Sequence, residues 1–492
     1  MRSRSLLLAL AAASALAGTP VLGKPICRDC NVILVTIDVW RADELTSGGS
    51  ARVIMPHLEA LASKGVAFAN VYSPSSGTTP ADLSILSGLY QWHHGVDVPL
   101  RDKSKKDEWA RSGRTLPALL RGRGYEVYAG DLGSTDDLNR MLDRELAVAG
   151  KAPRPEDVKQ GGKFFMLLRG SLHDPYFPEP SDVKALAPEV APDQYPTSED
   201  VLRCDYASLL ARKPPASLRF PREGTDFWFQ SDADRRTASE IVDSDDPSHR
   251  LEVVHRWNPL AATYTLNSQC FWSFFSSATI QTARLLYDAS ARRVDRILGD
   301  LLGSLAAKGL LKNTLIVVTA QHGEAFLEHG YINHSSRLHT EVLHVPLVFS
   351  APSLKGGLVV PDVVRSIDIM PTILDALGER LPPDLDGKSL LPCLAGRCPK
   401  SLALAYYDKH FGIRDDRYSF LSGTEPDELY DRRTDPKEQV NIAQKDPETS
   451  ARYKALLEKN IKDSDLVKIR EGIWPDWVDD NMREQIIRTG YW

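Results

Sequence analysis

The chain has 492 residues, of which 42% are hydrophobic and 26% charged, a composition typical of globular proteins. Its length allows one large domain with a smaller one, or two or three domains of ordinary size. The net charge of −6 and the lack of a basic cluster interleaved with aromatic residues argue against nucleic acid as a partner.

The first 23 residues have the pattern of a secretory signal peptide. Residues 1–4 are basic, residues 6–18 are apolar, and a cleavage point follows near Gly23. A membrane anchor is the alternative, but Gly18 and Pro20 interrupt the apolar run, and no other segment is long enough to span a bilayer. We therefore expect a secreted or periplasmic protein with no stable membrane insertion after cleavage.

Residues from 31 to about 185 alternate between strand-like and helix-like segments. The expected strands are 32–37, 66–71 and 164–168, and the expected helices are 56–65, a segment after Pro80, and 116–123. Pro56 just inside one helix and Gly124 just after another fit the usual helix boundaries. This alternation predicts an α/β fold with a doubly wound, mostly parallel sheet flanked by helices.

Residues 187–278 have weak periodicity and are rich in Asp, Ser, Pro and aromatic residues, which indicates an insertion into the main domain. Its aromatic residues include Phe227, Trp228, Phe229, Trp272, Phe274 and Phe275. They would form either one wall of a substrate cleft or a small core of the insertion itself.

The pattern of the main domain resumes after the insertion and changes again near residue 400. Apolar residues step by four and three across 287–305, which predicts an amphipathic helix. We expect buried strands at 315–318 and 345–349 and a helix at 369–377, which complete a domain spanning residues 24–399. Two short antiparallel strands at 418–421 and 428–431 and a helix at 448–463 predict a smaller C-terminal α+β subdomain, residues 400–492.

Polar residues follow two of the buried strands at the point where each strand ends. Asp38 comes after the strand at 32–37, and Gln321, His322 and Glu324 come after the strand at 315–318. Open α/β sheets bind ligands at the carboxyl ends of their strands, so these two ends could meet over one site although they are far apart in sequence.

Export makes the six cysteines candidates for disulfide bonds. Cys393 and Cys398 could close a short loop, and Cys27 and Cys30 precede the first strand, where a thioredoxin-like redox role does not fit. Cys204 and Cys270 remain and could bridge the middle region, but the sequence alone does not fix the pairing.

Seven stretches of the chain resemble, in the same order, motifs of the sulfatase family of the alkaline-phosphatase-like superfamily. They are NVILVTIDVWRADEL (31–45), the segment 55–96, LYDASARRVDRILGDLL (286–302), NTLIVVTAQHGEAFLEHG (313–330), EVLHVPLVFSAP (341–352), DIMPTILDALG with LDGKSLLP (368–378, 385–392), and ELYDRRTDPKEQVNIA (428–443). The resemblance implies an ester hydrolase with a divalent metal, for which Ca²⁺, Mg²⁺, Mn²⁺ or Zn²⁺ would suit the ligand types.

The resemblance also implies site residues. The metal ligands would be Asp38, Thr78, Gln321 and His322, and Thr78 occupies the nucleophile position. Further catalytic or substrate-contacting residues would be His94, His173 and His334, with Arg41 and Glu324 nearby in their motifs.

Four features depart from the family pattern. Val39 follows Asp38 where many members have a second acid, Asp82 replaces an Arg beside the nucleophile, and Gln321 replaces an Asp. A lysine-containing stretch is replaced by residues 130–133. The site is therefore short of negative charge, and we hypothesise that Asp82 partly restores the lost carboxylate.

A threonine nucleophile cannot yield the formylglycine aldehyde of many sulfatases, because its oxidation gives a ketone. Relatives in the superfamily with a threonine nucleophile act on phospho- or phosphonate esters, so the resemblance favours phosphoryl chemistry. Thr78 also precedes a helix, where a threonine commonly caps the first turn. His94 follows His93 at the end of a helix, where a surface imidazole is the ordinary explanation.

We expect an exported, sulfatase-like hydrolase that cleaves a sulfate, phosphate or phosphonate ester of a small molecule or glycan. The alternative is a catalytically silent relative that binds an anionic ligand or glycan. Exchanging Arg for Asp beside the nucleophile changes the local charge by about −2, which would repel such an anion and favours this alternative.

Overall fold

A computed structural model of the chain describes residues 26–96, 113–132, 158, 161–176, 178–196, 200, 271, 274–275, 279–334, 337–394, 397–407, 410–423 and 426–461. The proposed signal peptide, Cys204, Cys270, Phe227–Phe229 and Trp272 lie outside these residues.

A seven-stranded sheet forms the centre of the main domain, in the order β3-β4-β1-β5-β8-β2-β9. Its strands are β1 (Asn31–Asp38), β2 (Val66–Tyr72), β3 (Glu126–Asp131), β4 (Phe164–Ser171), β5 (Thr314–Thr319), β8 (His344–Ser350) and β9 (Leu358–Arg365). Only β8 runs antiparallel to both of its neighbours, and the other pairs are parallel. The expected α/β fold with a mostly parallel sheet is therefore confirmed.

The first and fifth strands of the chain lie side by side, although nearly 300 residues separate them. In β1 and β5, Asn31 pairs with Thr314 and Thr36 with Thr319 in parallel register. Both strands are almost wholly buried, which explains their continuous apolar sequence. Their carboxyl ends consequently open at the same edge of the sheet, as the strand-end pattern predicted.

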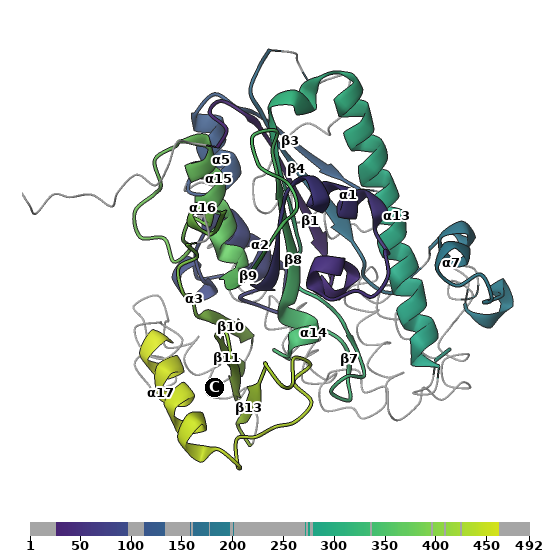
Figure 1. The fold of residues 1–492 in the computed structure, drawn as a ribbon, viewed down its shortest axis with the longest axis vertical. Coiled ribbons are helices and arrows are strands. Elements are labelled where there is room, and N and C mark those ends of the chain that lie inside the picture. The colour runs from purple at the N-terminus through teal and green to yellow at the C-terminus, as the bar shows by residue number, and fades with distance from the viewer. Residues whose placement is uncertain are drawn as a thin grey trace, which may run out of the picture.

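Helices cover both faces of the sheet, with α1 and α13 on one side and α2, α5 and α15 on the other (Figure 1). The helices of this domain are α1 (Pro56–Lys64), α2 (Thr78–Ser87), α3 (Gln91–His94), α5 (Leu116–Gly122), α7 (Pro180–Leu186), α13 (Ile280–Ala307), α14 (Thr340–Leu343), α15 (Ile369–Leu377) and α16 (Leu391–Leu394). Short 3₁₀ turns lie at Ala42–Glu44, Thr46–Gly48, Pro192–Gln194, Leu310–Asn313 and Ser366–Asp368, and a small hairpin joins β6 (Ala325–Phe326) to β7 (Ile332–Asn333).

The C-terminal part of the described chain is a four-stranded antiparallel sheet with one helix packed on it (Figure 1). Its elements are β10 (Ala403–Tyr407), β11 (His410–Arg414), β12 (Tyr418–Ser422), β13 (Glu428–Asp431) and α17 (Pro447–Ile461). Phe420 of the sheet and Leu457 of the helix share one apolar core with Trp92 of α3. This arrangement confirms the expected strands at 418–421 and 428–431, while the proposed domain boundaries stay predictions.

Two disulfide bonds lie within the described residues, Cys27–Cys30 and Cys393–Cys398. Of the aromatic residues named for the proposed insertion, Phe274 and Phe275 lie within the described ranges, and both belong to or pack against the main apolar core. None of the helices in the described ranges combines the length and the apolar character that crossing a membrane requires.

Candidate active site

A carboxylate, a hydroxyl and an imidazole meet at the carboxyl ends of β1 and β5. The Thr78 hydroxyl donates to Asp38 Oδ2 over 3.0 Å, and its Oγ1 lies 3.2 Å from His322 Nε2. His322 Nε2 is 3.4 Å from Asp38 Oδ1, and both side chains are buried. Three residues that the resemblance placed in one site therefore touch each other.

Helix α2 delivers Thr78 to this point. The helix begins at Thr78, and Gly77 is its N-cap, with no side-chain cap hydrogen bond. The hydroxyl of Thr78 thus faces Asp38 and His322 instead of capping the first turn, so the capping interpretation is wrong. The amino end of a helix favours negative charge, which would stabilise a developing alkoxide on Thr78.

Two further histidines surround this centre. His173 Nε2 lies 3.1 Å from Asp38 Oδ2, and its ring packs edge-on against His334 at 5.0 Å. The ring of His334 lies 4.3 Å from that of His322. His173 and His334 each keep 12% of their side chains exposed, so they line the accessible edge of the site.

His94 has a different environment. It is buried, its Nε2 lies 3.0 Å from Ser84 Oγ, and its Nδ1 accepts a hydrogen bond from the Val96 amide. A surface imidazole is therefore the wrong explanation for His94, although it suits His93, whose side chain is 47% exposed. The catalytic role of His94 stays a prediction.

Burial and hydrogen bonding set the protonation of the central pair. Burial alone would raise the pKa of Asp38, but His322, His173 and Thr78 outweigh it and hold this pKa below its ordinary value. Burial lowers the pKa of His322 despite the attraction of Asp38. Because His322 is then neutral at pH 7, with Nδ1–H donating to the Gly323 carbonyl at 3.0 Å, its Nε2 lone pair faces Thr78.

Gln321 is oriented by residues on both neighbouring elements. Its Nε2 donates to Thr36 Oγ1 on β1 over 3.3 Å and to Asp82 Oδ1 on α2 over 3.4 Å. Its Oε1 is buried and has no hydrogen-bond partner. A buried amide oxygen without a partner costs free energy, so a cation at this point would satisfy it.

These side chains are of the types that bind a divalent cation, and Asp38, Thr78 and His322 are in contact with one another. Asp38, Thr78 and Gln321 offer oxygen atoms, and His322 offers Nε2. Hard divalent cations prefer oxygen ligands, and an imidazole is also compatible with Mn²⁺ or Zn²⁺.

A buried arginine compensates the negative charge of Asp82. Arg169, near the end of β4, donates to Asp82 Oδ2 over 2.8 Å, and both side chains are fully buried. The net change relative to the family pattern is therefore smaller than the −2 expected from the sequence motif. Since both oxygens of Asp82 bind Arg169 or Gln321, this carboxylate orients Gln321.

Sequence reasoning missed Arg169 and Tyr176. Arg169 directly follows the apolar segment 164–168, and this position was the available signal. Arginine is seldom fully buried without a partner. Tyr176 donates to Glu324 Oε2 over 3.1 Å, and Glu324 Oε1 lies 3.3 Å from His334 Nδ1. Burial, followed by Asp174, raises the pKa of Glu324 well above its usual value, which favours the neutral form of this carboxyl.

The backbone at Val39 is unusual for a β-branched residue. Its φ of 60° lies in the left-handed region, and its side chain is buried in the main core. Such a conformation costs on the order of 1–3 kcal/mol and tends to occur at functional sites. The position that holds a second acid in many relatives is thus occupied here by an apolar residue in a strained turn.

Comparison with known proteins identifies the family. The sulfatase family profile matches residues 30–143 and 158–379, and the profile "N-sulphoglucosamine sulphohydrolase, C-terminal" matches residues 327–465. The chain belongs to the sulfatase family, and this membership supports an ester hydrolase.

Curated relatives and solved structures agree with this assignment. Human arylsulfatase K is 24% identical over 85% of this chain and 80% of its own. The mouse protein is 31% identical, but over only 35% of each chain. N-acetylglucosamine-6-O-sulfatase of Bacteroides thetaiotaomicron is 24% identical over 94% of this chain and 92% of its own.

Two solved structures show the same fold. The protein BT4656, solved with its substrate D-glucosamine-2-N,6-O-disulfate, has a TM-score of 0.58 at 20% identity and covers 88% of this chain and 97% of its own. The phosphonate monoester hydrolase of Silicibacter pomeroyi has a TM-score of 0.55 at 22% identity, covering 88% and 96%.

Proposed function

We propose that this chain is an exported hydrolase of sulfate, phosphate or phosphonate esters, with Thr78 as its nucleophile. The observation that carries the proposal is the hydrogen-bonded contact of Thr78 with Asp38 and His322 at the ends of two adjacent strands. The segments at 1–4 and 6–18 support export.

The first step is attack of Thr78 Oγ1 on the sulfur or phosphorus atom of the ester. The Thr78 proton passes to Asp38, the acceptor of its hydrogen bond, and the bond from sulfur or phosphorus to the leaving oxygen breaks. His173, at the accessible edge, is placed to give a proton to the departing alcohol. Water then releases sulfate, phosphate or phosphonate from the Thr78 ester and returns its hydroxyl.

A divalent cation held by Asp38, Gln321 and His322 would lower the pKa of the hydroxyl and neutralise charge on the reacting group. Thr78 excludes an aldehyde-based route, since a secondary alcohol oxidises to a ketone. The names of the relatives, which include glucosamine sulfatases and phosphonate monoester hydrolases, support a sulfated sugar or a phosphonate ester as substrate.

The test is hydrolysis of p-nitrophenyl sulfate, phosphate and phenylphosphonate by the purified chain loaded with Ca²⁺, Mg²⁺, Mn²⁺ or Zn²⁺. Thr78→Val keeps the shape of the side chain without its hydroxyl and should lower kcat by more than about 10³-fold. Thr78→Ser should retain activity. Thr79→Val, the same change one residue along α2, is the matched control and should behave like the wild type.

Two results would reject the proposal. Turnover by Thr78→Val at the wild-type rate would exclude Thr78 as nucleophile, and absence of turnover on every ester with every metal would favour the silent relative. Intact-mass analysis of quenched wild-type reactions should show one sulfo, phosphoryl or phosphonyl group on the peptide that contains Thr78. The amino-terminal sequence of the exported protein, expected near residue 24, tests the signal peptide.

A further inference from the structure

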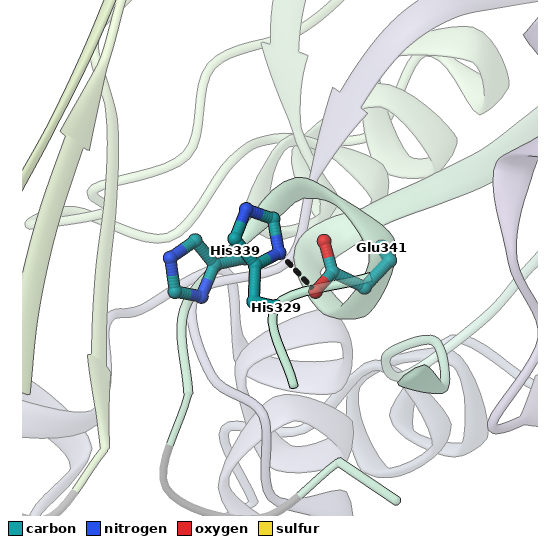
Figure 2. A group of neighbouring side chains, drawn as sticks. All are labelled: His329, His339 and Glu341. Atoms are coloured by element: carbon teal, nitrogen blue, oxygen red, sulfur yellow. Dashed lines mark hydrogen bonds and ion pairs between the residues drawn. The ribbon is translucent and has the colours of Figure 1, made fainter. Parts of the chain in front are cut away.

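A second cluster of metal-ligand side chains lies outside the candidate active site. It consists of His329, in the hairpin between β6 and β7, and His339 and Glu341, at the start of α14. One ligand atom from each residue lies within 4.8 Å of the others. The two imidazole rings stack with centroids 3.8 Å apart, and the carboxylate of Glu341 faces them (Figure 2).

In both histidines Nε2 bonds to a group outside the cluster, which leaves Nδ1 facing the cluster. His329 Nε2 donates to the backbone carbonyl of Glu438 over 2.7 Å, and His339 Nε2 donates to Glu428 Oε2 over 2.8 Å. Metal-bound histidines usually donate their other ring N–H to a carbonyl or carboxylate in this way, which fixes the tautomer and the ring orientation. The Nδ1 atoms are therefore the ligand atoms.

Glu341 provides an independent sign that the cluster lacks a partner. Its side chain is only 2% exposed, and its Oε2 is buried without a hydrogen-bond partner. Its Oε1 accepts a hydrogen bond from Tyr331 over 3.1 Å and lies 2.7 Å from His329 Nδ1, which would give up its proton when a cation binds. A buried carboxylate oxygen without a partner is costly, and a cation would satisfy it.

We propose that His329, His339 and Glu341 bind a zinc ion. Two imidazoles and one carboxylate are a ligand set that Zn²⁺ commonly accepts. Tetrahedral ligands at about 2.1 Å from zinc are roughly 3.4 Å apart, so His329 Nδ1 and Glu341 Oε1 would move apart from 2.7 Å by less than about 1 Å.

The site would connect the segment after β5 to the C-terminal sheet. His329, His339 and Glu341 belong to that segment, whereas Glu428 lies on β13 and Glu438 follows it. Arg414 on β11 binds the carboxylate of Glu438, which fixes the carbonyl that orients His329. The zinc is therefore structural, and the proposal does not depend on Thr78 or on hydrolysis.

The experiment measures zinc binding by the full chain after chelator treatment. His322→Gln removes the imidazole of the Asp38 site, and in this background we expect one zinc per chain by isothermal titration. Adding Glu341→Gln should abolish the binding of this zinc ion. Adding Glu428→Gln, which alters the outer partner of His339 and none of the three ligands, should weaken zinc binding by about 10–100-fold.

The matched control is His93→Gln, because His93 also pairs with a carboxylate, Asp386, at 2.7 Å but lies at the surface. It should leave the zinc equivalent unchanged. Equal zinc binding with and without Glu341→Gln would overturn the proposal, as would no zinc binding by folded His322→Gln. X-ray absorption spectroscopy of zinc-loaded His322→Gln counts the imidazole ligands of the zinc without a further substitution. Fewer than two imidazole ligands would also overturn the proposal.

Discussion

The buried pair of Asp82 and Arg169 gives a prediction whose magnitude follows from the structure. Their side chains are 0% and 1% exposed, and the Arg169 Nη2 to Asp82 Oδ2 distance is 2.8 Å. Removing the arginine leaves the buried Asp82 carboxylate without its cation, which costs about 3–5 kcal/mol. Replacing both with uncharged side chains leaves no such charge, so the double change should cost far less than the sum of the single changes.

The perturbation is therefore a double-mutant cycle of Arg169→Met and Asp82→Asn. Arg169→Met should lose about 3–5 kcal/mol of unfolding free energy and the double variant about 1–2 kcal/mol, so the two single effects should not add and the coupling should reach several kcal/mol. Equilibrium urea unfolding followed by fluorescence of the nine tryptophans measures these values as midpoint shifts at constant m-value.

A surface ion pair of similar length provides the control. Lys454 and Asp427 are 2.9 Å apart, but their side chains are 51% and 25% exposed. Lys454→Met should cost no more than about 1 kcal/mol. The reasoning is wrong if Arg169→Met costs no more than Lys454→Met, or if the two single effects in the cycle simply add.

Three further predictions concern buried polar groups. Gln321→Asp should tighten Ca²⁺ or Mn²⁺ binding in calorimetric titrations, because it adds an anion to the site, and unchanged affinity would show that Gln321 is not a ligand. Glu324→Gln should change the unfolding free energy by less than about 1 kcal/mol, since burial raises the pKa of this carboxyl well above its usual value and favours its neutral form. Glu438→Gln loses its charge beside buried Arg414 and should cost about 3–5 kcal/mol. Burial lowers the pKa of His344 to about 4 from the ordinary 6.5, so the unfolded chain takes up the proton first, and up to about 3 kcal/mol of stability should be lost as the pH falls from 6.5 to 4. His344→Gln should remove this slope in urea titrations, and an unchanged slope would refute the assignment.

Much of the fold could be predicted from local patterns. The apolar runs at 32–37 and 315–318 became β1 and β5, and the four-and-three spacing at 287–305 became part of α13. Less regular strands were missed. The edge strand β9 carries Pro361 and Asp362 in its middle, so neither an apolar run nor a strict alternation identifies it.

Strand order and charge pairing could not be predicted in the same way. The antiparallel β8 sits between β5 and β2 because of long-range pairing that no local segment encodes. The partner of Asp82 is likewise 87 residues away, on β4. The sequence thus indicated which residues gather at the strand ends, but the compensating arginine and the burial of His94 depend on tertiary packing.

The residues in contact at the candidate active site are carried by sheet strands, the turns directly after them and the first turn of α2. Backbone ladders between β1, β4 and β5 therefore fix the spacing of the reacting groups. Surface segments elsewhere can change in length or composition without disturbing that spacing. The choice of ester substrate can consequently differ between relatives while the residues that carry out the reaction stay in the same places.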